Sequence, residues 1–258
     1  PTPVATPPVA AANRRKFIFL ASSLAVIVLA AAGGTLWWFK FRPTPAPPPP
    51  PIIEPTPPAP ILRTPITQTV EAAAEGGIRD AVERVWSAPG TPRTPVTILV
   101  KITPADPGTP KRYAMTDDLI RATSITFPSA LKATITDLNF IWYAQEELFS
   151  ADDPANADRN RFGLAVRLNA TTEDGRQALA AWEPTIVADL DPYLRLSRFG
   201  ISANPEWRDN DYRGVAIRYA NFLLPDESID YAFLPAQNLL LITTSRESMY
   251  ALVDLVLM

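Results

Sequence analysis

The stretch FIFLASSLAVIVLAAAGGTLWWF, which runs from Phe17 to Phe39, decides how this chain is organised. It contains 23 residues and no charged side chain, and a helix of about 20 apolar residues is long enough to cross the hydrocarbon core of a bilayer. Trp37 and Trp38 stand near its end, where aromatic side chains meet the membrane–water interface. A buried helix of a soluble protein would seldom be this long without a polar face. The sequence therefore predicts one transmembrane helix over residues 17–39.

The charges that flank this helix indicate its orientation. Three basic residues at 14–16 lie on its N-terminal side, and Lys40 and Arg42 lie on the other. The positive-inside bias therefore favours a short cytoplasmic tail over residues 1–16 and a C-terminal domain outside the plasma membrane. The sequence begins with Pro1 and not with Met, so we expect further cytoplasmic sequence upstream.

A cleaved signal peptide is the alternative interpretation of the same stretch. Ala30, Ala31 and Ala32 supply small residues of the kind found at signal-peptide cleavage sites. Cleavage there would leave the aromatic and basic sequence WWFKFR close to the new N-terminus, which would be unusual for a mature exported protein. We therefore favour an uncleaved signal anchor.

Residues 40–65 are predicted to form a proline-rich linker. Pro43 to Pro65 contains 12 prolines in 23 residues, including an unbroken run at 47–51. Such a sequence cannot form helix or sheet ladders and favours the polyproline II conformation, which would extend over roughly 70 Å at about 3.1 Å per residue. A plain spacer is the simplest interpretation, and a ligand for a proline-binding module is the alternative.

Residues 66–258 are long enough to fold around a core, and their composition excludes several kinds of chemistry. The chain has no histidine and no cysteine, so zinc sites of the usual kind, thiol nucleophiles and Ser-His-Asp triads are excluded. From Ile66 onward there are 18 basic and 26 acidic residues, a net charge of −8. Nucleic-acid binding needs a basic surface, so no nucleic-acid partner is expected.

The order of predicted elements indicates a mixed α+β fold for this domain. Apolar alternation and β-branched residues predict strands at 66–70, 95–103, 137–144, 162–169, 212–220, 229–234 and 238–243. Capping residues and helical periodicity predict helices at 75–86, from Thr116, from Pro128, from Thr171 or Thr172 to about Leu190 with a kink at Pro184, and from Ser245 to the C-terminus. Helices and strands do not alternate regularly, which argues against a doubly wound parallel fold.

Ser129 and Lys132 match a pattern that serine nucleophiles use. The sequence Ser129-Ala-Leu-Lys132 fits S-x-x-K at a helix start, and Ser202-Ala-Asn204 resembles a downstream S-x-N. A desolvated lysine one turn away could activate such a serine. However, no K-[ST]-G follows and the domain is small for a penicillin-binding-type enzyme. We therefore interpret Ser129 as a helix-start residue and Lys132 as a solvated side chain, and we expect no catalytic residue in this domain.

Metal and cofactor sites are not expected either. The loop at 150–160 is rich in Asp and Asn, but counting from Asn156 places Arg161 at the glycine position of an EF-hand and Arg167 at its final glutamate position. Asp209-Asn-Asp211 is interpreted as a turn before a strand. The fingerprints G-x-G-x-x-G, the P-loop and H-E-x-x-H are absent. Trp142-Tyr143 sits at strand spacing and is interpreted as core.

Three stretches resemble an uncharacterised family of single-pass membrane proteins from candidate-phyla bacteria with reduced genomes. They are residues 182–192 (WEPTIVADLDP), residues 162–164 (FGL) and residues 239–248 (LLLITTSRES). In that family a helix of the W-E-x-x-x-x-x-D-L type follows a strand, and a late strand ends in T-S before a final helix. The resemblance runs from about Val96 to the end and implies the same layout. No activity is established for the family, so it implies no catalytic residue.

These observations favour a non-enzymatic, membrane-anchored module that works by protein–protein contact, as in an envelope or pilus assembly. Its expected partners are the lipid bilayer and an envelope protein. A ligand- or cell-wall-binding module is the first alternative, and a Ser-Lys hydrolase that uses Ser129 and Lys132 is the second.

Overall fold

The computed structural model divides the chain into two units, Pro1–Ile52 and Ile53–Met258, which are described separately. The described residues are 33–35, 37, 38, 40, 54–88, 90–106, 108–146, 159–196, 205–222 and 227–258. In the first unit the described residues are helical, and the rest of the predicted transmembrane helix lies outside them. No helix in the described part of the chain combines the length and apolarity needed to cross a bilayer.

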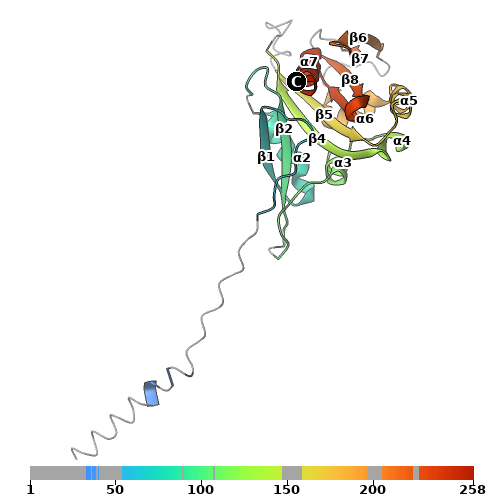
Figure 1. Cartoon of the computed structure of the whole chain (residues 1–258). Helices are drawn as coiled ribbons and strands as arrows, with labels where there is room; N and C mark the ends of the chain where they lie inside the picture. The colour runs from blue at the N-terminus through green and yellow to red at the C-terminus, as the bar shows by residue number, and fades with distance from the viewer. Residues whose placement is uncertain are drawn as a thin grey trace, which may run out of the picture. The chain divides into compact units, whose positions relative to one another are not determined.

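Within the described residues of the second unit, nine strands form one sheet (Figure 1). The strand order is β1-β2-β4-β5-β9-β8-β7-β6, with β3 paired to β2 beside this path. The strands are β1 Ile66–Ala73, β2 Val96–Thr103, β3 Arg112–Tyr113, β4 Ile135–Ala144, β5 Asn160–Leu168, β6 Arg208–Tyr212, β7 Val215–Asn221, β8 Ser228–Leu234 and β9 Leu239–Thr243. β1 and β2 run parallel, and all other neighbours in this order are antiparallel.

Short helices connect and cover the strands, which confirms the predicted α+β class. They are η1 Glu75–Gly77, α2 Ile78–Trp86, α3 Thr116–Thr123, α4 Ser129–Lys132, α5 Thr172–Trp182, α6 Ile186–Leu194, η4 Pro235–Gln237 and α7 Arg246–Leu257. The parallel pair is joined through α2, and most antiparallel pairs are joined by shorter connections, as strand geometry requires.

The larger core lies between one face of the sheet and helices α2 to α6. Side chains alternate along a strand, so Leu138, Phe140 and Trp142 of β4 point to this face and are almost completely buried. Trp182, at the end of α5, has no exposed surface, and its indole N–H donates to Asp189 Oδ2 of α6 at 2.8 Å. The aromatic side chains therefore fill the space where the helices meet the central strands.

The opposite face of the sheet is covered by α7 and by residues 54–65, which we call the strap. Leu62 of the strap is only 4% exposed and shares a core with Met249 and Leu252 of α7. The backbone N–H of Ile61 donates to Asn139 Oδ1 at 2.7 Å. Ile61 and Leu62 are the apolar pair within a proline-rich segment, and burying them ties that segment to the sheet.

The strap changes the boundary between linker and domain. The sequence predicts a linker over residues 40–65 and a domain over 66–258, whereas the compact unit begins at Ile53. Glu54 forms an ion pair with Lys101 on β2, and the hydroxyl groups of Thr64 and Thr97 are hydrogen-bonded at 2.9 Å. Residues 54–65 are therefore part of the folded domain in spite of their prolines.

Two local predictions differ from the structure, and both involve turn chemistry. The single strand predicted at 212–220 is a hairpin of β6 and β7, because Arg213 and Gly214 adopt positive φ angles of 56° and 79° and reverse the chain. Asp209-Asn-Asp211 is therefore part of β6 and not a turn. The predicted kinked helix is two helices, α5 and α6, because Pro184 lies in the turn between them.

Helix starts follow the predicted capping residues in two of three cases. The hydroxyls of Thr171 and Ser245 each accept a hydrogen bond from a backbone N–H three residues later, at 3.2 Å. Thr116 is instead the first helical residue of α3, and its neighbour Met115 is the N-cap. The carboxylate of Asp118 accepts from the backbone N–H of Met115 at 3.0 Å and provides the capping interaction.

Candidate functional site

The S-x-x-K pair lies on the surface. Ser129 and Lys132 begin and end the one-turn helix α4, and both are exposed, while Leu131 between them is buried. A serine activated by lysine needs that lysine in a desolvated position, and Lys132 is not in one. Ser202 and Asn204, which resemble the downstream motif, lie outside the described residues.

The oxygen-rich segments also carry no assembled site in the described residues. The acidic loop at 150–158 lies outside them, and Asn160 starts β5, where its side chain bonds to Trp86 and Trp142. Asp209 of β6 forms an ion pair with Arg218 of β7 at 3.1 Å. Among the described residues, no group of three or more acidic side chains is placed to hold a metal ion.

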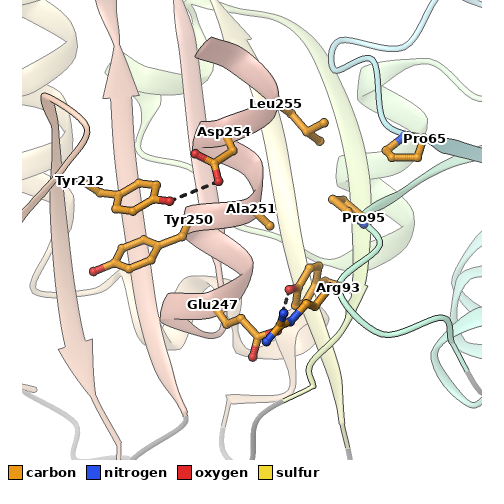
Figure 2. Close-up of a pocket in the computed structure, with 10 residues that line it drawn as sticks. Pro65, Arg93, Pro95, Tyr212, Glu247, Tyr250, Ala251, Asp254 and Leu255 are labelled. Carbon is orange, nitrogen blue, oxygen red and sulfur yellow. Dashed lines mark hydrogen bonds between the residues drawn. The ribbon is translucent and has the colours of Figure 1, made fainter. Parts of the chain in front are cut away.

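An open groove of about 600 Å³ runs over the exposed face of α7 (Figure 2). Tyr212 and Tyr250 stand at one side of the helix, and Pro65, Pro95 and Arg93 lie at the other. The remaining lining residues are Tyr143, Glu247, Ala251, Asp254 and Leu255. The groove is therefore lined by residues of the strap, β4, β6, the loop before β2 and α7.

Two stacked tyrosines form one wall of the groove. The rings of Tyr212 and Tyr250 lie 3.9 Å apart and nearly parallel, at 3°. The Tyr212 hydroxyl donates to Asp254 Oδ2 at 3.2 Å, and the Tyr250 hydroxyl accepts from Asn210 Nδ2 at 2.7 Å. Partial burial and the bond to Asp254 raise the pKa of Tyr212, so it stays a neutral donor.

Glu247 and Tyr143 form the second fixed point, near the first turn of α7. The Tyr143 hydroxyl donates to Glu247 Oε1 at 2.7 Å, and the backbone N–H of Glu146 donates to the same oxygen at 3.2 Å. Burial of the ring and the neighbouring carboxylate raise the pKa of Tyr143 well above its usual value. Arg93, at the rim, is paired with Glu146.

The carboxylates of the groove are therefore bound within the protein. Glu247 accepts hydrogen bonds from the Tyr143 hydroxyl and from a backbone N–H. Asp254 accepts a hydrogen bond from the Tyr212 hydroxyl and forms an ion pair with the guanidinium of Arg213 at 2.6 Å. Hydrogen bonds and an ion pair of this kind fix the positions of the side chains that form the surface. Aromatic rings, proline rings and aliphatic carbons are left as the contact surface, with tyrosine hydroxyls at its edge.

Local sequence positions the groove residues on α7 in a simple way. Met249, Leu252 and Val253 face the sheet and are fully buried, so helical spacing turns Glu247, Tyr250 and Asp254 outward. The sequence predicts the buried face of this helix, but it does not predict that the outer face lines a groove. Tyr143 was interpreted as core, and it is buried, but its hydroxyl also lines the groove.

Only part of the groove could have been predicted from local sequence. Tyr250 and Asp254 are four positions apart on the polar side of an amphipathic helix, which can be read from sequence. Their partners Tyr212 and Arg213 come from a strand that was predicted to begin at Tyr212, without the hairpin. Pro65 was assigned to the linker. No sequence pattern shows that these segments meet.

Comparison with known proteins adds no relative. No protein-family model matches this chain, and neither the curated proteins nor the solved structures contain a match. The resemblance to a family of single-pass membrane proteins stays a prediction.

Proposed function

We propose that this chain is a membrane-anchored, non-enzymatic binding module that holds an envelope protein in the groove over α7. The observation that carries the proposal is the groove itself, a preformed aromatic and proline-lined surface with internally satisfied charges. Rigid tyrosines give large contact area at low cost in side-chain entropy, which is why they are common in protein interfaces. An assembly module of the bacterial envelope is the class of protein that best combines these features.

The anchor rests on sequence and on two exposed side chains. The uncharged stretch over residues 17–39 has the length of a membrane span. In the first unit, Trp37 and Trp38 are 63% and 57% exposed, an exposure that the membrane–water interface would cover. The flanking basic residues favour a cytoplasmic N-terminus and an extracytoplasmic binding domain.

The shape and chemistry of the groove favour an extended peptide segment of the partner. The groove is open along α7 and lined by two proline rings, three tyrosines and Leu255. Grooves of this kind bind extended or proline-containing segments through ring contacts and a few hydrogen bonds. Tyr250 uses its oxygen as an acceptor for Asn210, so its hydroxyl proton can be donated to a carbonyl of a bound backbone.

Photo-cross-linking in native membranes tests the proposal. A full-length tagged chain carries benzoylphenylalanine in place of Tyr250, and a matched control carries it in place of Arg176, an exposed residue of α5. We expect one defined envelope protein, in near-equal amount to the tagged chain, to cross-link at position 250 and not at position 176.

A groove-filling variant separates specific binding from chance capture. Ala251 lines the groove in the middle of α7, and Ala251→Gln adds bulk there while keeping a good helix former. This change should abolish the cross-link at position 250. Equal capture from both positions, or capture that survives the change, would exclude the groove as the binding site. Recovery of no partner would count against the whole proposal.

A further inference from the structure

We propose that the first half of β1, residues 66–70, pairs edge to edge with the same segment of a second copy of this chain. This edge lies at the other end of the sheet from β6 (Figure 1). It adjoins the groove at Pro65, but the pairing residues 66–70 do not line the groove, and the inference does not rest on the proposed function.

The outer edge of β1 is open in the described part of the structure. β1 is the first strand of the sheet order, and the described residues contain no strand paired to its outer side. The Thr64 hydroxyl donates to the Ile66 carbonyl at 2.7 Å, and Arg84 donates to the Glu71 carbonyl at 3.0 Å. Between these two bonds, no described side chain is hydrogen-bonded to the backbone of residues 67–70. An unpaired row of backbone groups is a template for another strand.

The sequence of this edge lacks the usual protection against pairing. Residues 66–70 read ITQTV, with no charge, no proline and three β-branched residues besides Val70. The opposite edge strand, β6, is only five residues long and reads RDNDY, with three charged side chains. Charges and short length are the devices that keep sheet edges apart. One margin of this sheet is therefore protected and the other is not.

The side chains of the first four residues of the segment are also exposed, whereas Val70 packs partly against the core. Ile66 is 43% exposed although it is a large apolar residue, and Thr67, Gln68 and Thr69 are exposed as well. An added strand would cover Ile66 and supply partners for the backbone at the same time.

A second copy is the occupant that fits this edge, because the segment is complementary to itself. Pairing two identical strands about a two-fold axis is antiparallel. With Gln68 on the axis, Ile66 of each copy lies opposite Val70 of the other, and Thr67 lies opposite Thr69. Apolar and Thr–Thr cross-strand pairs are both favourable.

The same register ends the pairing cleanly at both sides. Glu71 then lies opposite Pro65, so no like charges meet. Pro65 has no N–H to donate, and the Glu71 carbonyl is already bound by Arg84. Moving the axis by one residue, to Thr69, would place the charged Glu71 opposite Thr67 and the polar Gln68 opposite Val70, and would replace the Ile66–Val70 pair by Ile66 opposite the smaller Ala72.

Disulfide cross-linking tests the register directly, because the chain contains no cysteine of its own. The full-length chain in detergent micelles carries single cysteines at positions 67, 68 or 69. Gln68→Cys should cross-link to its own copy most strongly on mild oxidation. Thr67→Cys and Thr69→Cys should cross-link poorly alone, and they should form a mixed dimer when differently tagged chains are combined, since only the mixed pair is directly opposed.

A cysteine on the protected edge and a charged variant complete the test. Asp209→Cys lies on β6 with a side chain that is 82% exposed, and it should give only background cross-linking. The double variant Thr67→Lys/Thr69→Lys should halve the protein mass measured by light scattering. The proposal is overturned if Gln68→Cys cross-links no better than Asp209→Cys, if the unmodified chain has the monomer mass, or if the lysine variant keeps the dimer mass.

Discussion

Replacing Asp230 by asparagine should make the domain more stable above neutral pH and leave it unchanged in acid. Asp230 lies on β8, on the face of the sheet that α7 covers, and only 2% of it is exposed. Burial raises the pKa of Asp230 to about 7, although the Ser228 hydroxyl and the positive charge of Arg246 both oppose this rise. The side chain is therefore protonated in the folded protein at pH values where it would ionise in the unfolded chain.

The direction and size of the effect follow from linkage. Between the unfolded pKa of 3.8 and the folded value of about 7, the folded state binds more protons than the unfolded state, so stability falls as pH rises. The stabilising contribution is complete below the unfolded pKa and is lost as pH rises through the folded one. At about 1.4 kcal/mol per pKa unit, the loss amounts to about 4 kcal/mol. Asparagine resembles the protonated carboxyl and cannot ionise, so Asp230→Asn should remove this dependence.

Urea unfolding of the full-length chain in micelles, followed by tryptophan fluorescence from pH 4 to 8, measures the effect. The difference in unfolding free energy between Asp230→Asn and the unmodified chain should grow from near zero at pH 4 towards about 4 kcal/mol above pH 7. Ser228→Ala removes a hydrogen bond that lowers the pKa of Asp230, so it should extend the dependence to higher pH. A difference that is constant with pH, or largest in acid, would refute the reasoning.

Three further predictions concern stability and use the same unfolding measurement. Gly163→Ala should lower the free energy of unfolding by about 1–3 kcal/mol, because an added Cβ would lie 2.7 Å from the Ile242 carbonyl oxygen of β9. The control Gly76→Ala has open space around the added Cβ and should be nearly neutral. Equal effects of the two changes would contradict this account of β5. Leu62→Ala should cost about 2–4 kcal/mol if the strap is part of the core, and a loss below about 0.5 kcal/mol, the usual size for a surface site, would show that the strap is not held. Ser245→Ala removes the N-cap of α7 and should lower the free energy of unfolding by about 1 kcal/mol. An unchanged urea midpoint would contradict this prediction.

The elements that the sequence predicts correctly are those whose structure depends on residues close together in the chain. β4 and β5 alternate or run apolar, because both are central strands packed on two faces. Ser245 and Thr171 are capping residues that act within one helical turn. Such features depend on neighbours in the chain, so they can be read without knowing the tertiary fold.

The parts that were missed depend on segments far apart in the chain. β6 is polar because it is an edge strand, and its Asp209 pairs with Arg218 across the hairpin. A polar strand cannot be distinguished from a loop by its sequence pattern. The strap is rich in proline, and the contacts that bind it come from distant residues such as Asn139, Thr97 and Lys101. The groove has the same origin, since Tyr143, Tyr212 and Tyr250 come from three separate elements.

If the chain is anchored as proposed, the strap shortens the spacer between the predicted membrane helix and the folded domain. If residues 43–65 were all free, a polyproline II chain would reach roughly 70 Å, but Leu62 and Ile61 fix the strap to the sheet and Glu54 pairs with Lys101. Only residues 43–53 then remain as spacer, with a reach of about 35 Å at the same rise per residue. Under the proposed anchoring, a shorter spacer would keep the domains closer to the membrane plane and would raise the local concentration for the proposed pairing of two β1 edges. Residues 54–65 of the proline-rich segment are a structural element of the domain, and the residues before Glu54 keep the predicted role of a spacer. Lengthening the spacer should weaken pairing of full-length chains in membranes without changing the stability of the domain.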